Sequence, residues 1–357
     1  MTNKADIHTS EKETSVRSKL APLSLFFSAV LLGATAARAT PTLTEIGISP
    51  GDFPTGLIQA SDGNFYGVTH LYRSIVFKLT PSGQFTVLFT APYDEKTNSY
   101  PDGNGYLDLV EGPDGFLYVV DGLILRISKS GTDAKVVHYG SSVAMSLASD
   151  GNFYGADSNG TFRFTTGGTY TPLYQTGSNG FIVQSFSKQA RDGNFYGFCY
   201  QYGTGYHVCR ATTSGQVTSI YTGLWPARYF LTQGSDGFLY GSALSGSFQV
   251  IFQLSLSGSY RQLYQSKTCT AKSGCSMVLQ ASDGNLWITN PTGDSVYSIT
   301  PTGGALLQTV PFGSNGHPQI LIQASSGILY GTTGEPNPAY NNPGSLFMID
   351  AGLPPPK

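Results

Sequence analysis

Short runs in which hydrophobic and polar residues alternate, separated by Gly-containing turns, fill the chain from residue 42 to residue 350. The first complete group consists of GLIQAS (56–61), NFYGVT (64–69), IVFKLT (75–80) and QFTVLF (84–89). A period of two between Asp-Gly and Ser-Gly turns is typical of β-hairpins, because Gly accepts a positive φ without a Cβ clash. The pattern predicts four antiparallel strands, named here A to D.

The four-strand group recurs seven times. Its marker is an Asp-Gly turn followed by an aromatic or apolar pair, as in DGNFYG, and the last copy reads SGILYG. The copies begin, at a mean step of about 44 residues, at Asp62, Asp114, Asp150, Asp192, Asp236, Asp283 and Ser326. A period in the forties with strand chemistry predicts four-stranded blades of a β-propeller.

The last repeat ends after its third strand, SLFMID (345–350). A spare strand, TLTEIGIS (42–49), precedes the first repeat and matches the missing D position. We therefore expect an all-β fold: one seven-bladed propeller over residues 40–352, with the ring closed by the N-terminal strand completing the last blade. Closure removes the free sheet edge between the first and last repeats. Residues 353–357 form a Pro-rich tail.

Residues 1–39 have the pattern of a signal peptide. Arg17 and Lys19 precede the apolar stretch LAPLSLFFSAVLLGATA (20–36), and Ala37-Arg38-Ala39 gives an A-x-A cleavage site. The alternative is an uncleaved N-terminal anchor. Because no later stretch is long and apolar enough to cross a bilayer, we expect an exported protein that is periplasmic, extracellular or at the cell surface.

Composition and charge narrow the function classes. Aromatic residues reach 13% and charged residues only 12%, with 44 Gly and 20 Pro, which excludes a disordered chain and a helical bundle. Without residues 1–39, the chain has 15 basic and 19 acidic residues and no basic run. Nucleic acid is therefore not expected as a partner, and we expect a monomer.

The loops divide into two classes. The A–B and C–D turns are nearly constant in length, whereas the B–C and D–A loops differ between repeats, and the two classes fall on opposite faces of the ring. We call the second the variable-loop face; variable loops on a rigid scaffold commonly carry binding. Tyr suits carbohydrate or protein contacts there. The candidate ligand-binding residues are Tyr93, Asp94, Tyr100, Tyr200, Tyr202, Tyr206 and Tyr340.

The runs LIQASDGNFYGVT, VFKLTPSG and ILIQASSGILYGTT resemble the GloVer tandem repeat of exported and surface bacterial proteins, over essentially all of 43–352. That resemblance implies a propeller without an established chemistry. More distantly, ASDGNLWITN and SVYSITPTG (281–303) are similar to the virginiamycin B lyase, NHL and SMP-30-like propellers. The lyase family uses His, Glu and magnesium near the ring axis. No Glu ends strand B in any repeat here, so the resemblance supports the fold and argues against that activity.

No cofactor is predicted. The stretch DGNGYLD spaces oxygen side chains as calcium loops do, through Asp102, Asn104 and Asp108, but lacks the terminal Glu of an EF-hand loop, and a solvated loop is the default interpretation. No HExxH, H-x-H or G-x-S-x-G motif occurs. The leading hypothesis is a binding module for a glycan or protein, and the alternative is a propeller enzyme of the lyase or lactonase type.

Strand A carries a repeated polar position three residues before each turn. Its occupants are Gln59, Glu111, Leu147, Gln189, Gln233, Gln280 and Gln323. They could line a polar channel for a small ligand, or hydrogen-bond the inner strand edge or a neighbouring blade. Repetition favours the second interpretation. The Asp of each turn is expected to accept backbone N–H groups of its own turn.

The four cysteines permit two disulfides in an exported protein. Cys199 and Cys209 lie in strands B and C of one hairpin, and would be directly opposite if its loop is centred on Thr204. Cys269 and Cys275 flank a five-residue loop. We expect the pairs Cys199–Cys209 and Cys269–Cys275; the alternative is four free thiols.

Overall fold

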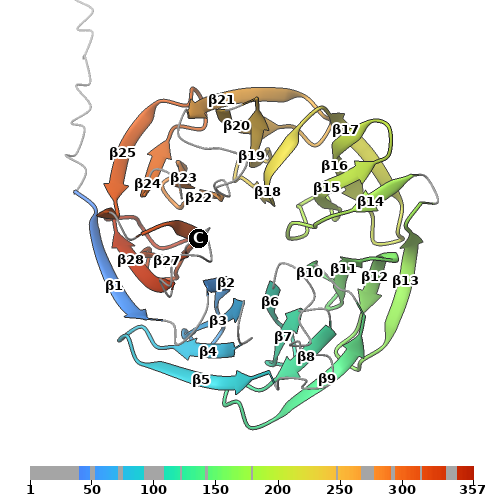
Figure 1. The fold of residues 1–357 in the computed structure, drawn as a ribbon, viewed down its shortest axis with the longest axis horizontal. Coiled ribbons are helices and arrows are strands. Elements are labelled where there is room, and N and C mark those ends of the chain that lie inside the picture. Colours follow the sequence, from blue (N-terminus) through green and yellow to red (C-terminus); the bar gives the residue numbers. More distant parts are fainter. Residues whose placement is uncertain are drawn as a thin grey trace, which may run out of the picture. The chain divides into compact units, whose positions relative to one another are not determined.

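A computed structural model describes residues 40–48, 53–70, 75–91, 108–120, 123–140, 144–177, 180–246, 248–266, 277–290, 294–313, 316–334 and 344–357. In these residues, β-strands form seven four-stranded antiparallel sheets arranged as the blades of a ring (Figure 1). They all belong to one compact unit, Ala39–Lys357. The predicted seven-bladed propeller is confirmed.

Each blade runs from an inner strand A near the axis to an outer strand D at the rim (Figure 1). Blade one contains β2 (Phe53–Gln59), β3 (Phe65–His70), β4 (Ile75–Leu79) and β5 (Phe85–Thr90). Blade two contains β6 (Asp108–Glu111), β7 (Leu117–Val120), β8 (Leu123–Ile127) and β9 (Ala134–Tyr139). Blade three contains β10 (Ala144–Leu147), β11 (Phe153–Asp157), β12 (Gly160–Phe164) and β13 (Tyr170–Gln175).

The remaining four blades repeat this order. Blade four contains β14 (Phe181–Val183), β15 (Phe195–Gln201), β16 (Gly205–Ala211) and β17 (Val217–Thr222). Blade five contains β18 (Trp225–Gln233), β19 (Leu239–Ser245), β20 (Phe248–Leu254) and β21 (Tyr260–Ser266). Blade six contains β22 (Val278–Gln280), β23 (Leu286–Asn290), β24 (Ser295–Ile299) and β25 (Leu306–Pro311). Blade seven contains β26 (Pro318–Gln323), β27 (Leu329–Thr333), β28 (Ser345–Asp350) and β1 (Thr42–Ile48).

The N-terminal strand closes the ring, as predicted. β1 pairs antiparallel with β28, with Thr42 opposite Asp350. Blades one and seven also touch through a 4.0 Å contact between the rings of Phe65 and Tyr330. The outer strand of the last blade therefore comes from the other end of the propeller sequence.

The hydrophobic core lies between neighbouring blades. Every residue of β11 and β23 is buried, whereas the outer strand β5 has exposed and half-exposed residues. A middle strand is covered on both faces by adjoining blades, so its sequence is apolar without strict alternation. Within a blade, the small Gly67 of β3 lies opposite Phe77 of β4, and a Cβ at Gly67 would clash with that ring. The Gly of the repeated FYG motif thus makes room for the aromatic residue of strand C.

The Asp-Gly turns bind their own backbone and side chains. Asp62 accepts the N–H of Asn64 at 3.2 Å and the hydroxyl of Tyr66 at 2.8 Å. The same Asp–Tyr bond recurs at 2.9 Å in blade three and 2.7 Å in blade four. The predicted structural role of these carboxylates is confirmed.

The polar position of strand A joins neighbouring blades. The side-chain Oε1 of Gln189 accepts the backbone N–H of Ser149 in the preceding blade at 2.8 Å, and its Nε2 donates to Gly193 O in its own turn. Equivalent bonds to the preceding blade are made by Gln59, Glu111, Gln233, Gln280 and Gln323. The interpretation that these side chains link blades is confirmed, and we call each such bond an inter-blade link.

One junction has no such link. Leu147 of blade three stands at the acceptor position, and the matching donor position of blade two is Pro113. Proline has no backbone N–H. The acceptor position thus holds leucine at the one junction where the donor position has no N–H to donate.

The C-terminal tail returns to the turns of the last two blades. The carbonyl oxygen of Pro354 accepts a hydrogen bond from Nε2 of Gln323 at 3.2 Å and another from the hydroxyl of Ser282.

In the described part of the chain, no helix could span a membrane.

Candidate functional site

A hairpin of blade four forms the candidate site on the variable-loop face. β15 and β16 are joined by Tyr202, Gly203 and Thr204, with Gln201 paired to Gly205. Gly203 and Gly205 have positive φ values of 86° and 90°, which glycine adopts without a Cβ clash. The turn closes with a 3.2 Å bond from Thr204 N to Gln201 O. The register is thus centred on Gly203.

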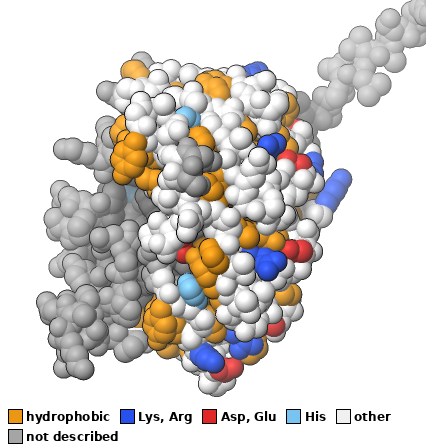
Figure 2. Space-filling view, turned by 90° about the vertical axis from the view of Figure 1, so that its right-hand side faces the viewer, with side chains coloured by type: hydrophobic (Ala, Val, Ile, Leu, Met, Phe, Trp, Pro, Cys, Tyr) orange, Lys and Arg blue, Asp and Glu red, His pale blue; other side chains and the backbone are white. Residues whose placement is uncertain are grey.

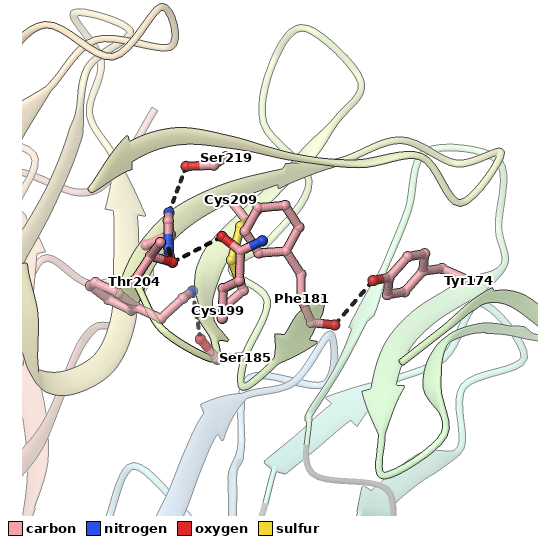
Figure 3. Close-up of a disulfide and its surroundings, with 10 residues drawn as sticks. Tyr174, Phe181, Ser185, Cys199, Thr204, Cys209 and Ser219 are labelled. Carbon is pink, nitrogen blue, oxygen red and sulfur yellow. Dashed lines mark hydrogen bonds between the residues drawn. A yellow bond between two sulfur atoms is a disulfide. The ribbon is translucent and has the colours of Figure 1, made fainter. Parts of the chain in front are cut away.

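A disulfide joins Cys199 to Cys209 across this hairpin (Figure 3). The predicted pair is confirmed, but the loop is not centred on Thr204, the position that would place the two cysteines directly opposite each other. Cys199 lies opposite His207 and Cys209 lies opposite Gly197, so the two cysteines are diagonal neighbours. They still share one sheet face, since side chains alternate with a period of two, and their Cα atoms are 5.9 Å apart. Both cysteines are fully buried.

His207 ties the hairpin tip to the outer strand. Its Nε2 lies 2.8 Å from Thr204 Oγ1, and its Nδ1 lies 2.9 Å from Ser219 Oγ. Thr204 donates its only hydroxyl proton to Oε1 of Gln201, so Nε2 donates to Thr204 and Nδ1 accepts from Ser219. Figure 3 shows dashed hydrogen bonds at the hydroxyl groups of Thr204 and Ser219. Burial lowers the pKa of His207, which favours this neutral form.

Four aromatic rings near the end of the hairpin form a continuous row, which we call the aromatic row: Tyr202, Tyr200, Tyr206 and Trp225. Successive ring centroids are 5.5, 5.1 and 5.2 Å apart, and all three contacts are edge-to-face. Tyr200 and Tyr206 are directly opposite each other in β15 and β16, and Trp225 begins β18 of blade five.

The two ends of the aromatic row are the exposed ones. Tyr202 is 78% exposed and Trp225 is 60% exposed, whereas Tyr200 and Tyr206 are half-buried. Edge-to-face geometry is a favourable aromatic arrangement. The middle rings therefore contact two outer rings that are largely exposed to solvent.

The chain segments around the aromatic row contain few charged residues. The sequence has no Asp, Glu, Lys or Arg in 164–187, 193–209, 211–227 and 237–260. The nearest charged residue after Trp225 is Arg228 of β18, whose side chain the structure does not describe. Figure 2 views the rim at the right of Figure 1; most charged side chains lie in its right half and prominent hydrophobic ones in its left. The variable-loop face is thus poorly charged around the row.

Three of the predicted ligand-binding residues, Tyr200, Tyr202 and Tyr206, come together in this row. Trp225 was missed by the sequence reasoning. The sequence did contain a signal that set Trp225 apart. The other tryptophan, Trp287, occupies the repeated aromatic position after Asp283, whereas Trp225 lies outside the repeat pattern. The other candidates lie outside the described residues: Tyr93, Asp94, Tyr100, Tyr340, Asp102, Asn104, Cys269 and Cys275. Asp108 begins β6, but its side chain is not described.

A His–Asp pair lies elsewhere on the variable-loop face. Nδ1 of His317, in the loop before β26, is 2.7 Å from Oδ1 of Asp294, in the loop before β24. Asp294 has a φ of 43°. Among the described residues, no three His, Cys, Asp or Glu side chains converge as a metal site would require.

The fold is similar to that of known propellers. Virginiamycin B lyase from Staphylococcus aureus superposes with a TM-score of 0.66 at 16% identity, covering 87% of this chain and 99% of that chain. The extracellular domain of a two component system from B. thetaiotaomicron gives 0.61 at 14% identity, covering 86% of this chain and 39% of that chain. At these identities the likeness shows the fold alone.

No protein-family model matches the chain, so the GloVer resemblance is not confirmed. No curated protein matches it in sequence. The comparisons therefore support a propeller of the shape that virginiamycin B lyase has, without assigning a ligand or a reaction.

Proposed function

We propose that this protein is an exported binding module that holds a glycan or a protein on its variable-loop face, with the aromatic row as the contact surface. The observation that carries the proposal is the exposure of Tyr202 and Trp225 at the two ends of a row whose two middle rings are half-buried. Exposed Tyr and Trp are the side chains most enriched in binding hot spots.

The hairpin is rigid before any ligand arrives. A disulfide and the His207 hydrogen bonds hold its base and tip, which lowers the entropy lost on binding. One of the solved structures with this fold is the extracellular domain of a two component system, and such a location is compatible with export. Residues 1–39 and the proposed cleavage after Ala39 lie outside the described residues.

The experiment uses protein purified from the periplasm or medium of an expressing host, with its N-terminus sequenced. The native protein and a Tyr202→Ala/Trp225→Ala variant are compared on a glycan array and in pulldowns from envelope and extracellular fractions. We expect at least one ligand that the native protein retains and the variant loses. If both proteins bind the same ligands equally well, the aromatic row is not the binding surface.

A further inference from the structure

We propose that the aromatic row binds a neutral carbohydrate chain, whose sugar rings stack on the exposed rings of Tyr202 and Trp225. This inference rests on the proposed function and names the ligand class of the same site.

The shape of the row suits a chain of rings. Sugar rings present C–H groups on their faces, and these groups carry a small positive charge that is attracted to the negative face of an aromatic ring. Tyr202 and Trp225 are largely exposed aromatic rings at the two ends of the row, and half-buried Tyr200 and Tyr206 lie between them. A ligand that spans both ends must repeat a flat apolar surface, as an oligosaccharide does.

The described side chains around the row favour a neutral ligand. They include uncharged polar groups, such as those of Gln201 and Thr204, and no Lys or Arg; Arg228 of β18 has a side chain that the structure does not describe. Among the described side chains, an acidic polysaccharide would find no cation to balance its carboxylates. Hydroxyl and amide groups at the hairpin tip match sugar hydroxyls instead.

The row is also small for a protein contact. Stable protein interfaces surround their hot spots with many further contacts and enrich Arg alongside Tyr and Trp. Here the two most exposed rings stand at opposite ends of one row, and the hairpin tip between them consists of Gly203, Thr204 and Gly205. This arrangement favours a slender ligand over a broad one.

The two tryptophans make a direct assay possible. Trp225 is 60% exposed and Trp287 is fully buried, and the chain has two Trp in all. Acrylamide quenching of the native protein, minus that of Trp225→Phe, therefore reports on Trp225. The probes are neutral hexasaccharides (of β-glucan, xylan, mannan and chitin) and, as the acidic comparison, oligogalacturonate.

We expect a neutral hexasaccharide to shield Trp225 from acrylamide and shift its emission to the blue. Tyr202→Ala should weaken that binding by about tenfold or more. The matched control is Tyr139→Ala, because Tyr139 is 79% exposed but lies on β9 of blade two. Thermal melts confirm that each variant is folded.

Two outcomes overturn the inference. One is oligogalacturonate binding as tightly as the neutral probes; the other is neutral binding that Tyr202→Ala leaves unchanged. If no neutral probe binds while pulldown yields a protein that depends on the row, the inference fails and the proposed function stands. If nothing that depends on the row is found in either experiment, both fail.

Discussion

The side-chain Oε1 of Gln59 accepts a 2.7 Å hydrogen bond from the backbone N–H of Ser325, a residue 266 positions later in the chain. This bond is the inter-blade link between blades one and seven. Its Nε2 simultaneously donates to Gly63 O in its own turn, at 3.0 Å. One side chain therefore fixes a turn of the first repeat against a turn of the last.

Replacing Gln59 with Leu should lower the free energy of unfolding by about 1 kcal/mol, because Ser325 N–H and Gly63 O both lose a partner. Urea denaturation measures the change. Gln84→Leu is the control, since Gln84 is an exposed residue of the same repeat. Equal stability of both variants would show that the link across the ring closure does not contribute.

The unlinked junction between blades two and three can be given a link. In the Pro113→Ser/Leu147→Gln double variant, a serine N–H would face a glutamine acceptor as at the other junctions. We expect each single change to be neutral or destabilising and the pair to be coupled favourably by about 1 kcal/mol. A double-mutant cycle in urea measures this coupling, and additive effects would contradict it.

Removing residues 40–50 should strongly destabilise the propeller, because β1 supplies the whole outer strand of blade seven. Without it, the backbone of β28 becomes an unpaired edge that favours aggregation. A thermal melt and light scattering test this. Removing residues 355–357, which lie beyond the Pro354 contacts, is the control and should leave the melt nearly unchanged.

The Cys199–Cys209 disulfide should contribute on the order of 2 kcal/mol, since it closes a short loop. Its replacement by two alanines should lower the melting temperature of the oxidised protein and make the melt less sensitive to reductant. A non-reduced digest with alkylation identifies this pair and tests the predicted Cys269–Cys275 pair. Alkylation of Cys199 and Cys209 without reduction would contradict the structure.

Acid should destabilise the Asp-Gly turns. Burial acts to raise the pKa of Asp62, Asp150 and Asp192, but hydrogen bonds from the nearby Asn and Tyr side chains outweigh it and lower the pKa below 3.8. In the window below pH 3.8, the unfolded chain therefore binds more protons than the folded chain, and stability falls as the pH falls. Urea melts between pH 5 and pH 2 measure the slope. Asp192→Asn should reduce it.

Much of this fold was predictable because each repeat meets the same environment. The Asp-Gly turn, the following aromatic residue and the small Gly67 opposite Phe77 recur because every blade packs between two similar blades. The positions of the inter-blade links were also visible in the sequence as a repeated polar residue of strand A. At the junction of blades two and three, the acceptor position holds Leu147 and the donor position holds Pro113, so both partners of the link are missing together. Local pattern and repetition thus determined the blade, the number of blades and the closing strand.

The binding surface was only partly predictable. Tyr200, Tyr202 and Tyr206 stood out because they fall between repeated positions, but their contact with Trp225 depends on how blade five packs against blade four. The hairpin register could not be decided either, because the tip Tyr-Gly-Thr-Gly offers glycine at two positions. The local strand and turn pattern, together with its sevenfold repetition, specified the propeller. The tertiary structure decided the diagonal disulfide and the aromatic row, because both depend on contacts between strands and blades that no local pattern encodes.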